Sequence, residues 1–201
     1  MEIAKKLGVL VLVAFVLGAC ASHKAGFILV KNTNEYMNYQ KQEDVEIAAD
    51  LYANELKTKE GFYLNVNEKN FYPVNLIVRN NSEGRLFLLK ADVRIVDSVG
   101  NQYFPTSCSV MSGEFERSKI AYALLGFGIF SYLSADEANK RMETDRREKE
   151  LANDLVISPG QRASGFVYFK MPEGFKPNGM ILKVKLESPE TKKTHSFDLQ
   201  L

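Results

Sequence analysis

Residues 71–82 have the sequence Phe-Tyr-Pro-Val-Asn-Leu-Ile-Val-Arg-Asn-Asn-Ser, and this stretch contains the strongest strand signal in the chain. Val74, Leu76 and Val78 stand at every second position, the period that places side chains on one face of a β-strand. Pro73 stands at the start of this run, where a strand needs no backbone donor. We therefore predict a core strand that begins at Pro73 and is followed by a turn.

The same alternation returns along the chain in short segments separated by turn signals. Residues 80–84 (Asn-Asn-Ser-Glu-Gly) supply one such turn, because Asn and Gly tolerate positive φ. Short alternating strands with frequent turns are typical of antiparallel sheets packed face to face. The pattern predicts a mainly β fold, an antiparallel β-sandwich. The further strands are expected in the segments 45–51, 86–89, 93–96, 167–169, 180–186 and 197–201.

Three motifs resemble those of telokin-like, immunoglobulin-fold domains of exported bacterial proteins. Residues 71–82 are similar to their PV-x-L-x-V-x-N-x-S strand and turn, and residues 97–103 (Asp-Ser-Val-Gly-Asn-Gln-Tyr) to their D-x-x-G-x-x-Y hairpin. Residues 157–169 are similar to their PG-x-x-x-x-G-x-V-x-F pair. The resemblance implies an immunoglobulin-like sandwich over residues 45–201. Because such motifs specify turns and strand edges, they imply a fold and not a function.

The insert, residues 113–156, interrupts this strand pattern. Its first part, 120–135, contains no charged residue, whereas 136–154 is dense in charge. Ser134 and Glu137 form a capping box, which predicts that a helix begins there. Acidic residues precede basic ones by four positions on this helix, so we interpret the charge run as a solvated helix face. These pairs are Asp136/Lys140, Glu137/Arg141, Glu143/Arg147 and Asp145/Lys149.

The uncharged run 120–135 has two interpretations. It is short for a membrane span, which needs about 20 residues, and its glycines weaken an isolated helix. In the first interpretation it packs against the sandwich. In the second it forms a hydrophobic surface that contacts the membrane or a protein partner. The residues predicted for that surface are Leu124, Leu125, Phe127, Ile129, Phe130 and Tyr132.

The N-terminus resembles a bacterial lipoprotein signal peptide. Lys5 and Lys6 precede an apolar run, residues 7–17, which ends at the small residues Gly18 and Ala19 and then Cys20. The resemblance implies cleavage between Ala19 and Cys20. The Cys20 thiol would then receive diacylglycerol, and the freed amine a further acyl chain. Because each buried CH₂ adds about 0.8 kcal/mol, several acyl chains give durable membrane attachment.

These observations divide the chain into a signal peptide (1–19), a lipidated N-terminus with a linker (20–44) and a sandwich domain (45–201) that contains the insert 113–156. Ala21 and Ser22 follow the lipidated cysteine. In a Gram-negative cell, the resemblance to lipoproteins then implies the periplasmic face of the outer membrane.

The composition gives no sign of catalysis or of nucleic-acid binding. The chain has 26 basic and 25 acidic residues, and a nucleic-acid-binding protein usually needs a basic face. His23 and His195 are interpreted as surface residues without partner motifs, and Cys108 as a buried, inert thiol. We find no nucleophile motif, phosphate loop or metal-ligand spacing. The sequence therefore predicts no enzyme activity, no metal and no cofactor.

Two functions remain open. The first is a membrane-anchored envelope lipoprotein that acts as a non-enzymatic interaction or assembly module, with an envelope protein as partner and the insert as partner surface. The alternative is a lipoprotein that binds a small apolar ligand or a lipid, with the uncharged run of the insert lining a pocket.

Overall fold

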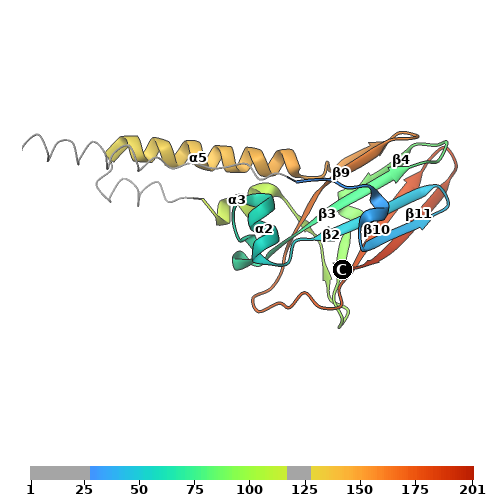
Figure 1. Cartoon of the computed structure of the whole chain (residues 1–201), viewed down its shortest axis with the longest axis horizontal. Helices are drawn as coiled ribbons and strands as arrows, with labels where there is room; N and C mark the ends of the chain where they lie inside the picture. The colour runs from blue at the N-terminus through green and yellow to red at the C-terminus, as the bar shows by residue number, and fades with distance from the viewer. Residues whose placement is uncertain (1–27, 117–127) are drawn as a thin grey trace, which may run out of the picture.

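The computed structural model describes residues 28–116 and 128–201, and for residues 128–134 it describes the backbone alone. The fold is mainly β, as predicted, with two sheets in which every strand pairing is antiparallel (Figure 1). The first sheet has the order β1-β2-β3-β9-β7. Its strands are β1 (Asn38–Gln42), β2 (Val45–Leu51), β3 (Phe71–Asn80), β9 (Arg162–Lys170) and β7 (Pro105–Thr106).

The second sheet has the order β6-β5-β10-β4-β8, and β11 pairs with β10 along its whole length. β10 pairs with β5 near its start and with β4 near its end, so these two short strands follow one another along the edge of β10 that β11 leaves free. The strands are β4 (Leu86–Leu89), β5 (Arg94–Val96), β6 (Gln102–Tyr103), β8 (Asp154–Ile157), β10 (Ile181–Ser188) and β11 (Lys193–Gln200).

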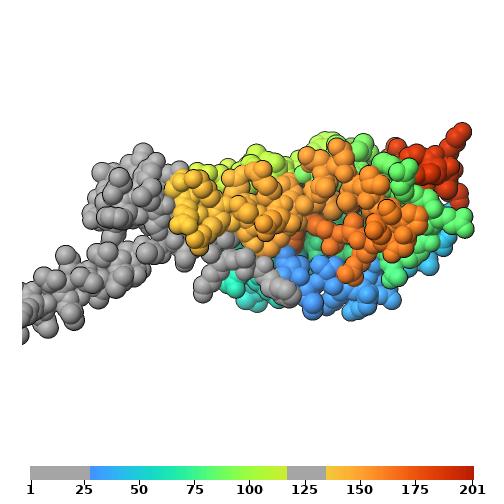
Figure 2. Space-filling view, turned by 90° about the horizontal axis from the view of Figure 1, so that it is seen from above, coloured from blue at the N-terminus to red at the C-terminus, as the bar shows by residue number. Residues whose placement is uncertain are grey.

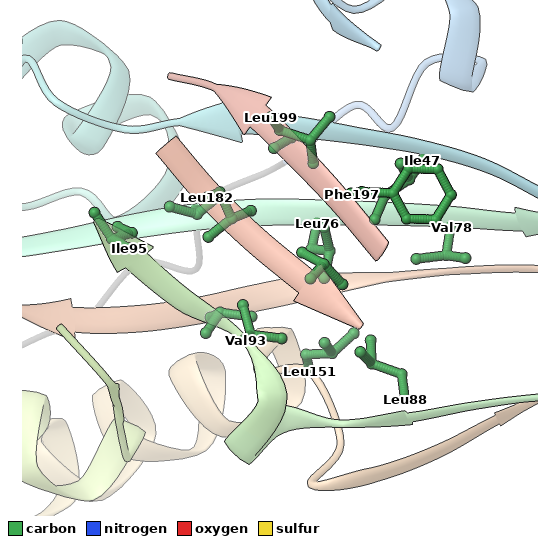
Figure 3. Packing of buried hydrophobic residues seen from close by; sticks show 14 of the residues in the cluster. Ile47, Leu76, Val78, Leu88, Val93, Ile95, Leu151, Leu182, Phe197 and Leu199 are labelled. Carbon is green, nitrogen blue, oxygen red and sulfur yellow. The ribbon is translucent and has the colours of Figure 1, made fainter. Parts of the chain in front are cut away.

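The two sheets share one hydrophobic core, which contains the alternating residues predicted from the sequence. Val74, Leu76 and Val78 of β3 are buried together with alternate residues of β10 and β11 (Figure 3). Leu151, which follows the insert's helix, lies in the same cluster near Leu88. The end of the insert is therefore fixed into the core.

The helices of the described residues lie together at one end of the sheets, and the longest of them, α5, extends well beyond the sheets (Figure 1). α3 packs against α5. All four predicted pairs of acidic and basic residues on α5 are confirmed as ion pairs. The helices are α2 (Glu55–Phe62), α3 (Cys108–Glu114) and α5 (Gly128–Lys149), with short 3₁₀ turns η1 (Thr33–Glu35), η2 (Val66–Lys69) and η3 (Lys90–Asp92).

The motif Asp97-x-x-Gly100-x-x-Tyr103 forms a turn, as its sequence predicts. The Asp97 carboxylate accepts hydrogen bonds from the backbone N–H groups of Val99 and Asn101 and from the Tyr103 hydroxyl, at 2.8–3.0 Å. Burial opposes the charge of this carboxylate, but the hydrogen bonds outweigh that effect and lower the pKa of Asp97. Gly100 has φ +94°, a conformation that favours glycine.

Pro73 does not begin its strand: it is the third residue of β3, a strand paired on both sides. It accepts a hydrogen bond from the Tyr52 N–H but has no N–H to return to the Tyr52 carbonyl. The side-chain amide of Asn67 donates to that carbonyl instead, at 3.0 Å, and to the Phe71 carbonyl at 2.8 Å. A side chain thus replaces the backbone donor that proline lacks.

Two further boundaries and the burial of one residue differ from those predicted. β1 lies inside the range 20–44, so the linker assigned to that range ends before Asn38. α5 begins at Gly128, before the capping box at Ser134, since the sequence from 128 to 133 contains no proline to stop it. His195 is buried on the inner face of β11, although the sequence predicts a surface residue.

Candidate functional site

The sequence-predicted surface of the insert is only partly described. Leu124, Leu125 and Phe127 lie outside the described residues, as do Ala19 and Cys20. Ile129, Phe130 and Tyr132 lie in the first turns of α5, where the backbone alone is described. Within the described ranges, no helix combines the length and the apolar character needed to cross a membrane.

The described residues form a different apolar site where the edges of the two sheets meet. We call it the edge groove, and its volume is about 360 Å³. Leu89 at the end of β4 and Asp154 at the start of β8 belong to one sheet, and Pro105 in β7 belongs to the other. The chain crosses between the sheets at Phe104, which separates β6 from β7. The lining residues are Leu89, Lys90, Ala91, Phe104, Pro105, Asn153 and Asp154.

A largely buried ion pair lies beside the edge groove. Lys90 Nζ is 2.7 Å from Glu150 Oε1, and the two side chains are 12% and 13% exposed. The other carboxylate oxygen of Glu150 accepts a hydrogen bond from the backbone N–H of Cys108, at 3.4 Å. Through Glu150, these contacts connect the end of α5 to both η3 and α3. Removal of either Lys90 or Glu150 would leave a buried charge without its counter-ion.

Cys108 is buried, as predicted, and its thiol is not a nucleophile at neutral pH. Burial, together with the neighbouring Glu150 carboxylate, raises the pKa of the Cys108 thiol to about 11. A thiol with this pKa stays protonated, whereas reactive cysteines have lowered pKa values. The residues around Cys108 therefore stabilise the junction and do not activate the sulfur.

Two exposed apolar side chains, Leu89 and Phe104, line the edge groove, and a third, Val156, lies two residues from the lining residue Asp154 on β8. Leu89 is 46% exposed, Phe104 60% and Val156 47%. In the antiparallel register Leu89 is opposite Asp154, so Val156 is its diagonal neighbour on the outer face of the sheet. The sequence contains a signal for this surface: residues 86–89 (Leu-Phe-Leu-Leu) are all apolar, and a strand must turn two of them outward.

α5 has one buried face in addition to the charged face predicted from the sequence. Ala135, Ala138 and Met142 recur at intervals of three and four residues and are buried. Arg146 continues this face and is wholly buried; its Nη1 donates to Ser112 Oγ at 3.3 Å. Burial lowers the pKa of Arg146 to about 10. Figure 2 shows the described part of α5 and the chain after it as one continuous strip along the molecule.

No group of three or more histidine, cysteine, aspartate or glutamate side chains is placed to hold a metal ion within residues 28–116 and 135–201. The edge groove itself combines apolar side chains with one exposed carboxylate, that of Asp154. Such a surface can bind apolar and basic groups of a partner.

Comparison with models of protein families and with curated proteins finds no match. Among solved structures, the chain is similar to the yjhA protein from Bacillus subtilis, with 10% identity, a TM-score of 0.42, and coverage of 82% of this chain and 98% of that one. It is also similar to ycdA, a candidate lipoprotein from Bacillus subtilis, with 10% identity and a TM-score of 0.42, over 81% of this chain and 38% of that one. A functionally unknown protein from Listeria monocytogenes matches at 11% identity and a TM-score of 0.39, over 81% of this chain and 80% of that one. At TM-scores below 0.5, these similarities establish neither a shared fold nor a shared function.

Proposed function

We propose that this chain is a lipid-anchored envelope protein whose two sheets form an immunoglobulin-like sandwich that binds another envelope protein and catalyses no reaction. The edge groove is the observation that carries the proposal. It contains two exposed apolar side chains, Leu89 and Phe104, and a third, Val156, is the diagonal neighbour of Leu89 on the outer face of the sheet. Clusters of this kind mark interaction sites, whereas single exposed apolar residues do not.

The anchor part of the proposal rests on the sequence Leu17-Gly18-Ala19-Cys20. Replacing Cys20 with serine is expected to abolish incorporation of an alkyne-labelled fatty acid in growing cells, because serine has no thiol to receive the lipid. Cys108→Ser is the matched control and should keep the label, since Cys108 is buried inside the folded domain. Equal labelling of the wild-type and Cys20→Ser chains would remove the anchor from the proposal.

The binding part is tested by photo-crosslinking in living cells. A photoreactive amino acid at Leu89 or at Phe104 is expected to form adducts with a specific protein, because both side chains surround the edge groove. The control probe at Val99 is more exposed than either position, but it lies in the turn between β5 and β6 and should form no such adduct. Identical adducts from all three positions, or none, would overturn the proposal.

The alternative function, binding of a small apolar ligand or a lipid, is favoured by the size of the edge groove. A volume of about 360 Å³ lies at the lower end of the range for ligand sites. In that case the probes at Leu89 and Phe104 should form lipid adducts and no protein adducts. The same experiment therefore separates the two functions.

A further inference from the structure

The edge groove continues into a strand edge that has free hydrogen-bonding groups. β8 pairs with β4 on one side and stands at the end of its sheet. Lys90 N donates to Asn153 O at 2.8 Å, so Asn153 faces β4 with its backbone groups. Because this orientation alternates along an antiparallel strand, Leu155 also faces β4, whereas Asp154 and Val156 direct their N–H and C=O groups outward. Within the described ranges, no strand pairs with that outward side.

The opposite side of the molecule is built differently. There β1 and β11 are the edges of the two sheets, and side chains of β1 bridge them. The side-chain amides of Gln40 and Gln42 donate to the backbone carbonyls of Asp198 and Ser196, each at 2.6 Å. Natural proteins usually cover or charge their strand edges in such ways. Compared with the bridged edges of β1 and β11, the apolar edge of β8 is therefore the exposed one.

The side chains beside this edge define what it could bind. Asp154 and Val156 share the outer face, and Leu89 and Phe104 lie next to Asp154 in the edge groove. The Asp154 carboxylate is exposed and forms no ion pair with the described residues. A strand added at β8 would place its own side chains opposite these residues on the same face. An apolar side chain suits Val156, a basic one suits Asp154, and an apolar one suits the edge groove.

We propose that β8 adds an extended segment of the envelope partner to its sheet, and that this segment has the pattern apolar-x-basic-x-apolar. The proposal rests on the proposed function and names the recognised chemistry at the same site. The pattern is the same in both chain directions, so it holds for parallel and antiparallel addition. Backbone hydrogen bonds from Asp154 and Val156 would provide affinity, and the three side-chain positions would provide specificity.

The test uses the full chain purified in detergent, and synthetic peptides as probes. The first peptide has the sequence Ser-Val-Thr-Lys-Thr-Val-Ser, the second replaces its lysine with glutamate, and the third is a scrambled sequence without the alternation. Hydrogen exchange at the amides of Asp154 and Val156 is expected to slow when the lysine peptide is added and to stay unchanged with the scrambled peptide. The lysine peptide should bind about tenfold more tightly than the glutamate peptide, and Asp154→Lys should reverse that preference.

Two variants of one residue separate backbone pairing from side-chain contact. Val156→Pro removes the outward N–H without removing a donor to β4, and an edge strand tolerates proline at such a position. Peptide binding should be lost in Val156→Pro and kept in Val156→Thr, which retains the N–H and the β-branched shape. Equal binding by both variants, or equal protection by the scrambled peptide, would overturn the proposal. Protection that rises with protein concentration in the absence of peptide would also overturn it, since a second copy would then occupy the edge.

The in-cell crosslink separates this proposal from the proposed function. If Val156→Pro leaves the protein adducts of the Phe104 probe unchanged, strand addition is wrong but partner binding at the edge groove stands. If the Phe104 probe forms no protein adduct even in the wild-type chain, the proposed function fails, and strand addition by an envelope partner fails with it.

Discussion

Replacing Asn80 with alanine is expected to lower the free energy of unfolding by about 3 kcal/mol, because several buried backbone groups would lose their partner. Asn80 is wholly buried at the end of β3. Its side-chain amide donates to the carbonyls of Gly84 and Ile157, at 2.8 and 2.9 Å. Its side-chain oxygen accepts from the Ser82 N–H at 3.0 Å and from the Ser82 hydroxyl at 2.6 Å.

The effect should be large because Asn80 connects the two sheets. β3 belongs to the first sheet, whereas Ile157 ends β8 of the second. Urea unfolding of Asn80→Ala should show a lower midpoint with an unchanged m-value. Asn81→Ala is the matched control, since its exposed side chain bonds only to Arg79 and Glu46 among the described residues. We expect that control to change stability by less than about 0.5 kcal/mol.

Asn80→Asp gives a second test with a definite sign. The substitution keeps an acceptor for Ser82 but turns a carboxylate oxygen toward the carbonyls of Gly84 and Ile157. Burial and these carbonyls would raise the pKa of the new carboxyl group above its value in the unfolded chain. The variant should therefore lie closest to the wild type below the unfolded pKa and lose stability as the pH rises through the folded pKa. A loss of stability relative to the wild type that does not change between pH 3 and pH 7 would contradict this account.

The sequence predicts the parts of the fold that local chemistry determines. Asn80 occupies the Asn position of the strand-and-turn motif, and the structure shows why an asparagine stands there. The ion pairs of α5 were equally predictable, because side chains four residues apart on a helix are neighbours. In each case the partners are close in sequence or the residue type has few conformational choices.

The sequence is less informative where distant segments meet. The sequence does not predict α2, because the apolar residues of this helix are few. Asn54 nevertheless caps it, since its side chain accepts a hydrogen bond from the Lys57 N–H at 2.9 Å. The edge groove combines residues from three segments that only the sheet order brings together. The burial of Arg146 was not predicted, since a charge on a polar helix is normally solvated. Its position depends on α3 packing over the same face.

Gly165→Ala is the second substitution for which we expect a large effect, a loss of about 2 kcal/mol of stability through overpacking. A Cβ at Gly165 would lie 2.9 Å from both Cα and N of Leu151 and 3.3 Å from the carbonyl carbon of Glu150. These are backbone atoms of the segment that leaves α5 and crosses β9, so no side-chain rotation relieves the contact. The Leu151 N–H donates to the Phe166 carbonyl at 2.8 Å, which holds that segment in place.

Two opposing terms decide the sign of this effect. Replacing glycine with alanine restricts the unfolded chain, which by itself stabilises a protein by about 0.4–1 kcal/mol. Gly113→Ala isolates that term, because Gly113 lies in α3 with an ordinary φ, and among the described residues nothing beyond its own helix backbone and chain neighbours lies within 4 Å of an added Cβ. Urea unfolding should therefore show Gly113→Ala as neutral or stabilising and Gly165→Ala as destabilising. Similar changes in the stability of both variants would show that the segment Glu150–Leu151 can move away from residue 165 at little cost.

The same substitution connects stability to the edge groove. Glu150 precedes Leu151, and its carboxylate holds Lys90, which lines the groove. If an added methyl group at residue 165 displaces Glu150, the Lys90 side chain loses its buried partner and the groove changes shape. We therefore expect Gly165→Ala to reduce crosslinking from the Phe104 probe even where the domain remains folded. Unchanged crosslinking in a folded but destabilised Gly165→Ala variant would show that the groove does not depend on the Lys90–Glu150 pair.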